Sequence, residues 1–134
     1  MIRQDSESKH ILSLFDFDGT LTYRDTMLAF TQFVSGKFRY WRGLFLLFPM
    51  LVRFRMGWIA RTKAKEKWLT YFFSGKSDSE LYALGKQFTN QVLPSLLRPT
   101  GIQRLKWHQE EGHQCYLVTA SLEWWTQAFA KEQG

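Results

Sequence analysis

Two short apolar runs, one near each end of the chain, predict β-strands. The first occupies residues 11–15 and the second lies within 114–120. A short continuous apolar run, rather than a strict alternation, is typical of a parallel strand that is buried on both faces. Residues 1–10 are polar, and we expect them to form a frayed lead-in to the first strand.

The long interval between these strands has a helical pattern of apolar residues. A first helix, capped by Asp25 or Thr26, is expected to end near Gly36. A second begins near Ala60 and ends at Gly75. Its inward face is predicted from helical spacing to contain Ala64, Trp68 and Phe72.

Capping and turn signals divide the rest of the interval into further helices. Ser77 and Glu80 have the spacing of a capping box, which opens a helix. The inward face of that helix is predicted to contain Leu81, Leu84 and Phe88. Pro99 suits the first turn of the next helix, which is expected to end at Gly112. The last helix is expected to follow the second strand and to run through Lys131.

Residues 43–52 are nearly all apolar, but they make up about half of the ~20 residues that a membrane-spanning helix needs. Pro49 also interrupts the run, so a transmembrane span is not expected. Arginines and tryptophans flank the segment, and two interpretations stay open. It forms either a buried helical hairpin of a small domain, or a lid that touches a membrane surface or a lipid-like substrate through residues 41–58.

The composition is that of an ordinary globular protein, with 45% hydrophobic and 22% charged residues. A net charge of +6 favours an anionic partner such as a phosphorylated metabolite, a nucleic acid or an acidic membrane surface. One basic run is expected to lie on the solvent side of its helix, and it consists of Arg61, Lys63, Lys65 and Lys67. We therefore expect no nucleic-acid partner.

Cysteine and histidine usage gives two further expectations. A single cysteine, Cys115, excludes a disulfide within the chain and suits a reducing compartment. The N-terminal residues contain no apolar core of a signal peptide, so the expected location is the cytoplasm, with the inner face of the membrane as a peripheral alternative. His108 and His113 have no cluster of metal-ligating residues at suitable spacing, and we expect surface histidines rather than metal ligands.

Two aspartates directly follow the first strand. Side chains two residues apart on a strand point the same way, so Asp16 and Asp18 can reach one ligand if the extended geometry persists to Asp18. Ligands bind at the carboxyl ends of parallel strands, and Gly19 lets the backbone turn there. Two carboxylates suit Mg2+, or a nucleophile paired with a general acid/base. A surface turn rich in Asp and Gly is the alternative, and the apolar strand in front of the pair favours the site.

The second strand also ends in polar residues, at Thr119 and Ser121, before a helix. Free backbone N–H groups and the helix dipole make such a strand end suitable for an anion. In the alternative interpretation Ser121 is only a helix N-cap. The aspartates after the first strand favour a phosphate site.

The residues DFDGTLT at 16–22 resemble the first motif of the haloacid dehalogenase-like (HAD) hydrolases. By this resemblance Asp16 would be the nucleophile that forms an aspartyl-phosphate, and Asp18 would be the general acid/base. The Asp16 carboxylate and the Asp18 backbone carbonyl would bind Mg2+. Gly19 and Thr20 would help to bind phosphate.

The residues VTAS at 118–121 resemble the second HAD motif, in which a Thr or Ser hydrogen-bonds the transferring phosphoryl group. Thr119 occupies the matching position and Ser121 is a supporting candidate. The two motifs together imply an α/β, Rossmann-like HAD core, of which the first two parallel strands are present.

The helical interval between the motifs is similar to the C1-type cap of the phosphoserine phosphatase-like HAD subfamily, IB. This implies a core at 1–22 and 99–134 and a cap at 23–98. Asp25 falls where that subfamily carries a substrate-binding acid. The apolar, arginine-flanked cap is also similar to that of bacterial phosphatidylglycerophosphate phosphatases, which keeps a lipid phosphate among the expected substrates.

Two later HAD motifs, a lysine and an acidic GDxxxD-like stretch, are not found before residue 134, and Lys131 does not fit the lysine's position. We therefore expect an N-terminal portion of a hydrolase with weak or no activity of its own, because phosphoryl transfer depends on electrostatic stabilisation. The expected parent function is Mg2+-dependent hydrolysis of a small phosphorylated metabolite or a lipid phosphate. The alternatives are a protein that binds a membrane surface or lipid phosphate, and a non-catalytic phosphate-binding module.

Overall fold

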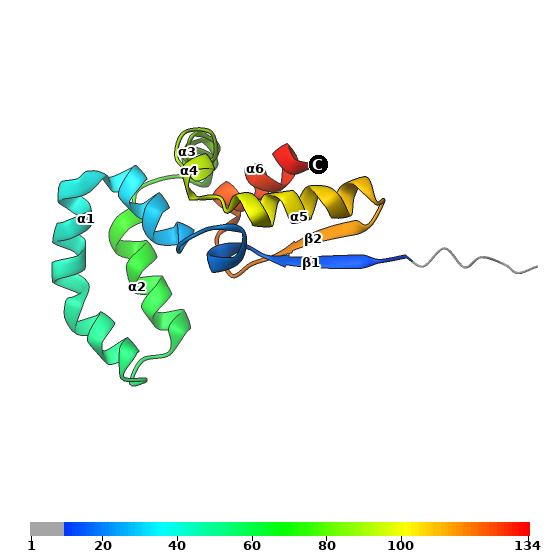
Figure 1. The fold of residues 1–134 in the computed structure, drawn as a ribbon. Helices are drawn as coiled ribbons and strands as arrows, with labels where there is room; N and C mark the ends of the chain where they lie inside the picture. The colour runs from blue at the N-terminus through cyan, green and yellow to red at the C-terminus, as the bar shows by residue number, and fades with distance from the viewer. Residues whose placement is uncertain (1–9) are drawn as a thin grey trace, which may run out of the picture.

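The computed structural model describes residues 10–134, so the lead-in expected at 1–10 falls almost wholly outside the described residues. Two strands and six helices follow one another along these residues, with one tight turn segment, η1, after the first strand (Figure 1). In chain order they are β1 (Leu12–Asp16), η1 (Phe17–Leu21), α1 (Thr26–Arg55), α2 (Arg61–Phe73), α3 (Asp78–Gln91), α4 (Leu93–Leu96), α5 (Pro99–Glu110), β2 (Gln114–Val118) and α6 (Glu123–Gln133).

The strands β1 and β2 pair in parallel, in a register that sets Asp16 beside Val118. The strand ends that carry the two motifs therefore meet at one edge of the sheet. One face of the sheet packs towards α5 and α6 through Phe15 and Leu117. The opposite face is open, since Leu14 and Tyr116 are more than half exposed. The expectation of strands buried on both faces was wrong, because an apolar run predicts a strand but not what covers it.

The chain leaves the sheet after β1 and returns towards it before α5, and backbone hydrogen bonds join these two passages side by side. Tyr23 donates its backbone N–H to the Leu96 carbonyl at 2.8 Å, and Arg98 donates to the Leu21 carbonyl at 2.8 Å. The residues between these passages form α1 to α4, and α1 and α2 make a hairpin that extends away from the sheet (Figure 1). The proposed division into a core at 1–22 and 99–134 and a cap at 23–98 stays a prediction.

The helix boundaries agree with most of the sequence signals. Gly36 breaks the helical geometry of α1 with a φ of 75°, which favours glycine, and the helix resumes beyond it. Pro49 lies inside α1 without ending it. The capping box of Ser77 and Glu80 opens α3 as predicted.

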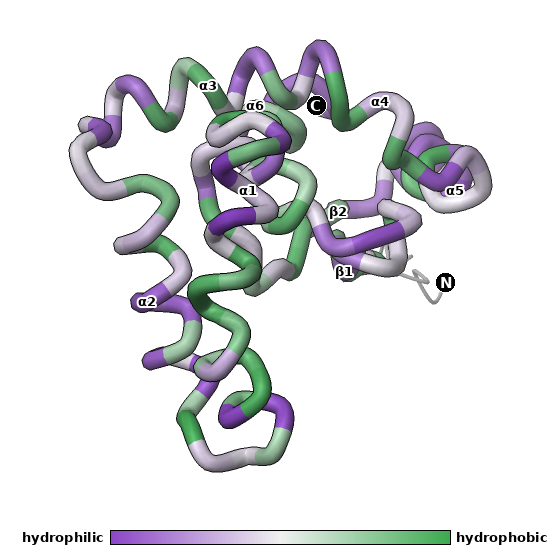
Figure 2. The backbone as a smooth tube through the Cα atoms, turned by 90° about the vertical axis from the view of Figure 1, so that its left-hand side faces the viewer, coloured by the Kyte–Doolittle hydropathy of each residue, from purple (hydrophilic) through white to green (hydrophobic). Residues whose placement is uncertain are grey.

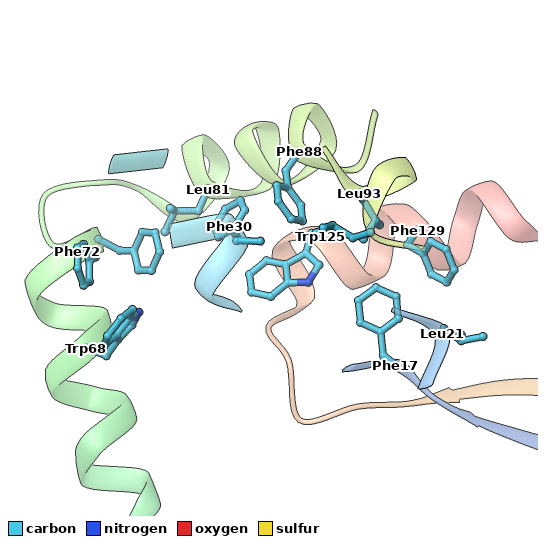
Figure 3. Close-up of a cluster of buried hydrophobic side chains, with 13 residues drawn as sticks. Phe17, Leu21, Phe30, Trp68, Phe72, Leu81, Phe88, Leu93, Trp125 and Phe129 are labelled. Carbon is cyan, nitrogen blue, oxygen red and sulfur yellow. The ribbon is translucent and has the colours of Figure 1, made fainter. Parts of the chain in front are cut away.

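One aromatic cluster joins the helical interval to the helix after β2 (Figure 3). Trp125 of α6 is fully buried, and its ring centroid lies 4.5 Å from that of Phe30 in α1. The predicted inward residues Trp68, Phe72 and Phe88 are also buried in this cluster. Gly85 lets α3 approach α6 closely, because a side chain there would collide with the Trp124 backbone.

Candidate active site

The candidate site is a pocket of about 660 Å³ at the carboxyl ends of the strands. Asp16 ends β1, and the chain stays extended at Asp18 before it turns at Gly19, whose φ is 78°. Both aspartates line the pocket, so they are brought together as the spacing predicted. Ser121, from the segment after β2, lines the same pocket.

Asp18 is held by three hydrogen-bond donors. The Thr26 backbone N–H donates to Asp18 Oδ1 at 2.7 Å, and the Thr26 hydroxyl donates to the same oxygen at 2.6 Å. The Ser121 hydroxyl donates to Asp18 Oδ2. The N-cap of α6 is Leu122, so the interpretation of Ser121 as a mere N-cap was wrong. These donors fix the orientation of the Asp18 carboxylate between β1, α1 and β2.

Thr26 has a larger role than its sequence position indicated. It was expected at most to cap α1, yet its buried hydroxyl also accepts a hydrogen bond from Trp125 Nε1 at 2.9 Å. The hydroxyl therefore links the largest buried side chain to a site carboxylate. A threonine eight residues from an aspartate gives no recognisable signal, because the contact depends on how η1 turns.

Asp16 has a different environment, since it is exposed at the end of β1 and accepts one hydrogen bond, from the Thr20 hydroxyl at 3.0 Å. Most of its oxygen lone pairs remain available. Within the described residues no group of three or more His, Cys, Asp or Glu side chains could hold a metal ion. A single exposed carboxylate with a neighbouring carbonyl still suits Mg2+, which is commonly bound by one or two carboxylates and keeps several waters.

The other predicted phosphate-binding groups are engaged within their own loops. The Gly19 N–H donates to the Thr22 hydroxyl at 3.2 Å, and the Thr20 hydroxyl contacts Asp16. The Thr119 hydroxyl accepts from the Ser121 N–H at 3.0 Å. In this structure these residues therefore shape the two loops, while the pocket surface between them is formed by Ala120 and Ser121.

Asp25 lies at the pocket and at the start of α1. Its carboxylate caps the helix by accepting from the Met27 and Leu28 N–H groups at 2.8 and 3.2 Å. Asp25 also lines the pocket. The other acidic residues of the pocket lining are Asp16 and Asp18. Capping and a role towards substrate are both compatible with this position.

Helix α2 supplies a cationic wall that the sequence did not reveal. Arg61 and Lys65 line the pocket, and Lys65 Nζ donates to the Ala120 carbonyl at 2.8 Å. The expectation that this basic run lies wholly on the solvent side was wrong for Lys65, which is half-buried, whereas Arg61 is exposed and also lines the pocket. They are four residues apart and therefore share one face of α2, with the buried Ala64 and Trp68 beside them.

The remaining wall of the pocket is apolar, and it consists of Met27, Leu28, Leu51, Phe54, Ala64 and Trp68. These residues come from α1 and α2. The pocket thus combines carboxylates on the strand side, cations on one helix and an apolar surface between the helices.

His108 and His113 lie outside this pocket, next to Ser13 of β1 and Trp107 of α5. The Ser13 hydroxyl and His113 Nδ1 each lie 2.8 Å from His108 Nδ1. Both histidines are half-buried, so they are less exposed than the expectation of surface histidines implied. Burial, together with the charges of Arg104 and His113, lowers the pKa of His108.

A sequence profile described as haloacid dehalogenase-like hydrolase matches residues 13–134. The chain therefore belongs to this family, and the parallel strands and helices described above have the HAD-like fold. Both the family and the fold class predicted from the two motifs are confirmed.

Two curated relatives are Protein CicA from the NA1000 / CB15N and the ATCC 19089 / CIP 103742 / CB 15 strains of Caulobacter vibrioides. Each is 31% identical over 124 residues, which cover 92% of this chain and 55% of the relative. The chain thus spans about half the length of the curated relatives that it matches.

Two solved structures are similar in fold. A protein with unknown function from Bordetella pertussis Tohama I has a TM-score of 0.75 and 25% identity, over 93% of this chain and 57% of its own. A phosphoserine phosphohydrolase-like protein from Francisella tularensis subsp. tularensis SCHU S4 has a TM-score of 0.59 and 18% identity, over 92% of this chain and 53% of its own.

Proposed function

We propose that this chain carries the nucleophile, the acid/base and part of the phosphate site of a Mg2+-dependent phosphomonoester hydrolase. One observation supports the proposal most strongly: an exposed carboxylate, Asp16, and an anchored one, Asp18, line one pocket beside Ser121. Two chemically similar groups in such different environments are suited to different roles. Membership of a hydrolase family supports the same assignment.

The exposed Asp16 is the nucleophile in this proposal. Its carboxylate oxygen forms a bond to phosphorus as the bond from phosphorus to the ester oxygen breaks, which leaves an aspartyl-phosphate. Asp18, protonated at the start of this step, gives its proton to the departing oxygen. Water then attacks the phosphorus and passes a proton to Asp18, while the bond from phosphorus to the Asp16 oxygen breaks and orthophosphate leaves. Because three donors hold Asp18, its carboxylate keeps one orientation through both steps.

Mg2+ would be held by the Asp16 carboxylate and the Asp18 backbone carbonyl, and when bound it supplies positive charge against the phosphoryl oxygens. The chain's own contribution is positioning. Ser121 and Thr119 order the loop after β2, and Arg61 and Lys65 place positive charge on the opposite wall. Preorganised charge of this kind is a main source of catalysis in phosphoryl transfer.

The substrate is proposed to be a phosphorylated metabolite or a lipid phosphate. Its phosphate would lie between Asp16 and the cationic wall, and its remaining part against Leu51, Phe54 and Trp68. The apolar wall favours a substrate with an apolar portion, because such a surface gains most by excluding water. Asp25 would contact a polar group of the substrate at the pocket edge. A cytoplasmic location stays a prediction.

The proposal is tested with p-nitrophenyl phosphate and Mg2+, comparing the chain with its Asp16→Asn variant. Asp78→Asn is the matched control, since Asp78 is exposed at the start of α3, away from the pocket. We expect slow turnover that falls to background in Asp16→Asn and is unchanged in Asp78→Asn. Turnover that survives the loss of the Asp16 carboxylate would exclude it as the nucleophile.

A further inference from the structure

We propose that the outer stripe of α1, defined as Phe38, Trp41, Phe45, Phe48 and Val52, docks on an anionic bilayer surface. These five residues are separated by three or four positions, so they lie along one side of the helix. The inference is independent of the proposed phosphatase activity. It concerns where the protein rests rather than the reaction it performs.

The stripe faces solvent. Phe38 is 81% exposed, Phe45 is 80% exposed and Trp41 is 64% exposed. The side of α1 that packs against α2 is a different one, where Gly43 meets the Phe72 ring. Figure 2 shows the two helices of the hairpin running side by side, with hydrophobic stretches along α1. A continuous exposed row of large apolar residues marks an interaction surface.

The charge of α1 favours an anionic partner. The helix contains no Asp or Glu and five cations: Lys37, Arg39, Arg42, Arg53 and Arg55. An apolar stripe between cations is the pattern of a helix that lies in the plane of an anionic membrane surface. A second copy of the chain fits less well, because joining two such hairpins would bring like charges together.

The hairpin is expected to enter only the interfacial region of the bilayer. Among the described residues no helix is long and apolar enough to cross a membrane. Trp58 and Met56, at the end of the hairpin, are 69% and 56% exposed and extend the apolar surface. Tryptophan is favoured at the boundary between headgroups and acyl chains. The hairpin therefore rests on the bilayer without spanning it.

The experiment is flotation of the full chain with vesicles that contain 30% phosphatidylglycerol in phosphatidylcholine, and with vesicles of phosphatidylcholine alone. We expect binding to the anionic vesicles and clearly weaker binding to the neutral ones. The triple variant Trp41→Gln, Phe45→Gln, Phe48→Gln should bind roughly a hundredfold more weakly. Glutamine keeps helix propensity. Its matched control is Leu12→Gln, Leu14→Gln, Tyr116→Gln, which removes equally exposed apolar residues from the open sheet face.

A charge variant keeps the test valid if the triple variant folds poorly. The double variant Arg53→Gln, Arg55→Gln should bind the anionic vesicles about thirtyfold more weakly at low salt. The control double variant Lys86→Gln, Lys106→Gln, with its substitutions on α3 and α5, should bind them as the unmodified chain does. Asp16→Asn should bind vesicles as the unmodified chain does, which separates this proposal from the catalytic one. Failure of the unmodified chain to float overturns the proposal. The proposal is also overturned if the stripe variant and the sheet variant lose vesicle binding equally. It is overturned as well if the unmodified chain forms a dimer without binding vesicles and the stripe variant is monomeric.

Discussion

The Ser121 hydroxyl donates a hydrogen bond to the Asp18 carboxylate and so connects the ends of the two parallel strands across 103 residues of sequence. This contact unites the two motifs in one site. It also means that Asp18 is positioned jointly by β1, by Thr26 of α1 and by the loop after β2.

Replacing Ser121 by Ala should lower the free energy of unfolding by about 1–2 kcal/mol, because a hydrogen bond to a charged group is lost. Urea denaturation measures the change. Ser95→Ala is the control, since Ser95 is exposed and its hydroxyl bonds only the Val92 carbonyl. Equal stability of the two variants would show that the Ser121 contact does not hold the loop.

Thr26→Val keeps the shape of the side chain but removes the hydroxyl shared by Asp18 and Trp125. We expect a loss of about 2–4 kcal/mol in the free energy of unfolding, because the buried Trp125 N–H is left without a partner. Thr26→Ser, which keeps the hydroxyl, should lose much less. Similar urea midpoints for the two variants would refute the role assigned to the hydroxyl.

Lys65→Gln tests the cationic wall. Lys65 reaches the Ala120 carbonyl beside Ser121, so its loss should weaken the binding of orthophosphate about five- to tenfold. Lys67→Gln is the matched control on the exposed side of α2 and should have no effect. Titration calorimetry measures both affinities. If both variants bind phosphate as the unmodified chain does, Lys65 plays no part in the site.

The lowered pKa of His108 predicts that the free energy of unfolding depends on pH. Burial, with the charges of Arg104 and His113, lowers the pKa of His108 in the folded state. The unfolded chain therefore binds a proton at His108 more readily, and stability falls as the pH drops below about 6.5, the pKa of an unperturbed histidine. Above that pH both states are neutral at this residue and the effect vanishes.

The measurement compares urea midpoints at pH 5 and pH 7.5 for the unmodified chain and for His108→Gln. The variant should lose less stability between the two pH values, because it removes the group whose protonation opposes folding. Carboxylates titrate in both proteins and cancel in the comparison. An equal loss in the two proteins would contradict the assignment to His108.

The sequence predicted the parts of the fold that local chemistry specifies. The strand ahead of Asp16, the capping box of Ser77 and Glu80 and the break at Gly36 all depend on residues close in the chain. The pairing of the two strand ends followed from the family resemblance. Long-range burial was not predictable in the same way, since Leu14 is as apolar as a buried residue and is nevertheless exposed.

In the candidate site, too, the sequence predicted some residues and missed others. Of the residues predicted as a group, Asp16, Asp18 and Ser121 share one pocket, whereas Thr119, Gly19 and Thr20 do not line it. Arg61 and Lys65 were missed, because basic residues on the exposed face of a helix normally point to solvent. The packing of α2 brings both to the pocket, where Lys65 donates to the Ala120 carbonyl. In the apolar segment 43–52, Phe45 and Phe48 are exposed rather than buried in the hairpin, and apolar character alone could not predict this.

In the proposed function, Asp16 is a carboxylate poised to accept a phosphoryl group with Mg2+. Beryllium fluoride tests this directly without requiring turnover, because it bonds to such a carboxylate as a mimic of the acyl phosphate. With Mg2+ present, 19F NMR of the chain should show protein-bound fluoride signals that vanish in Asp16→Asn and persist in Asp78→Asn. Bound signals that survive Asp16→Asn, or their absence from the unmodified chain with Mg2+, would contradict the account.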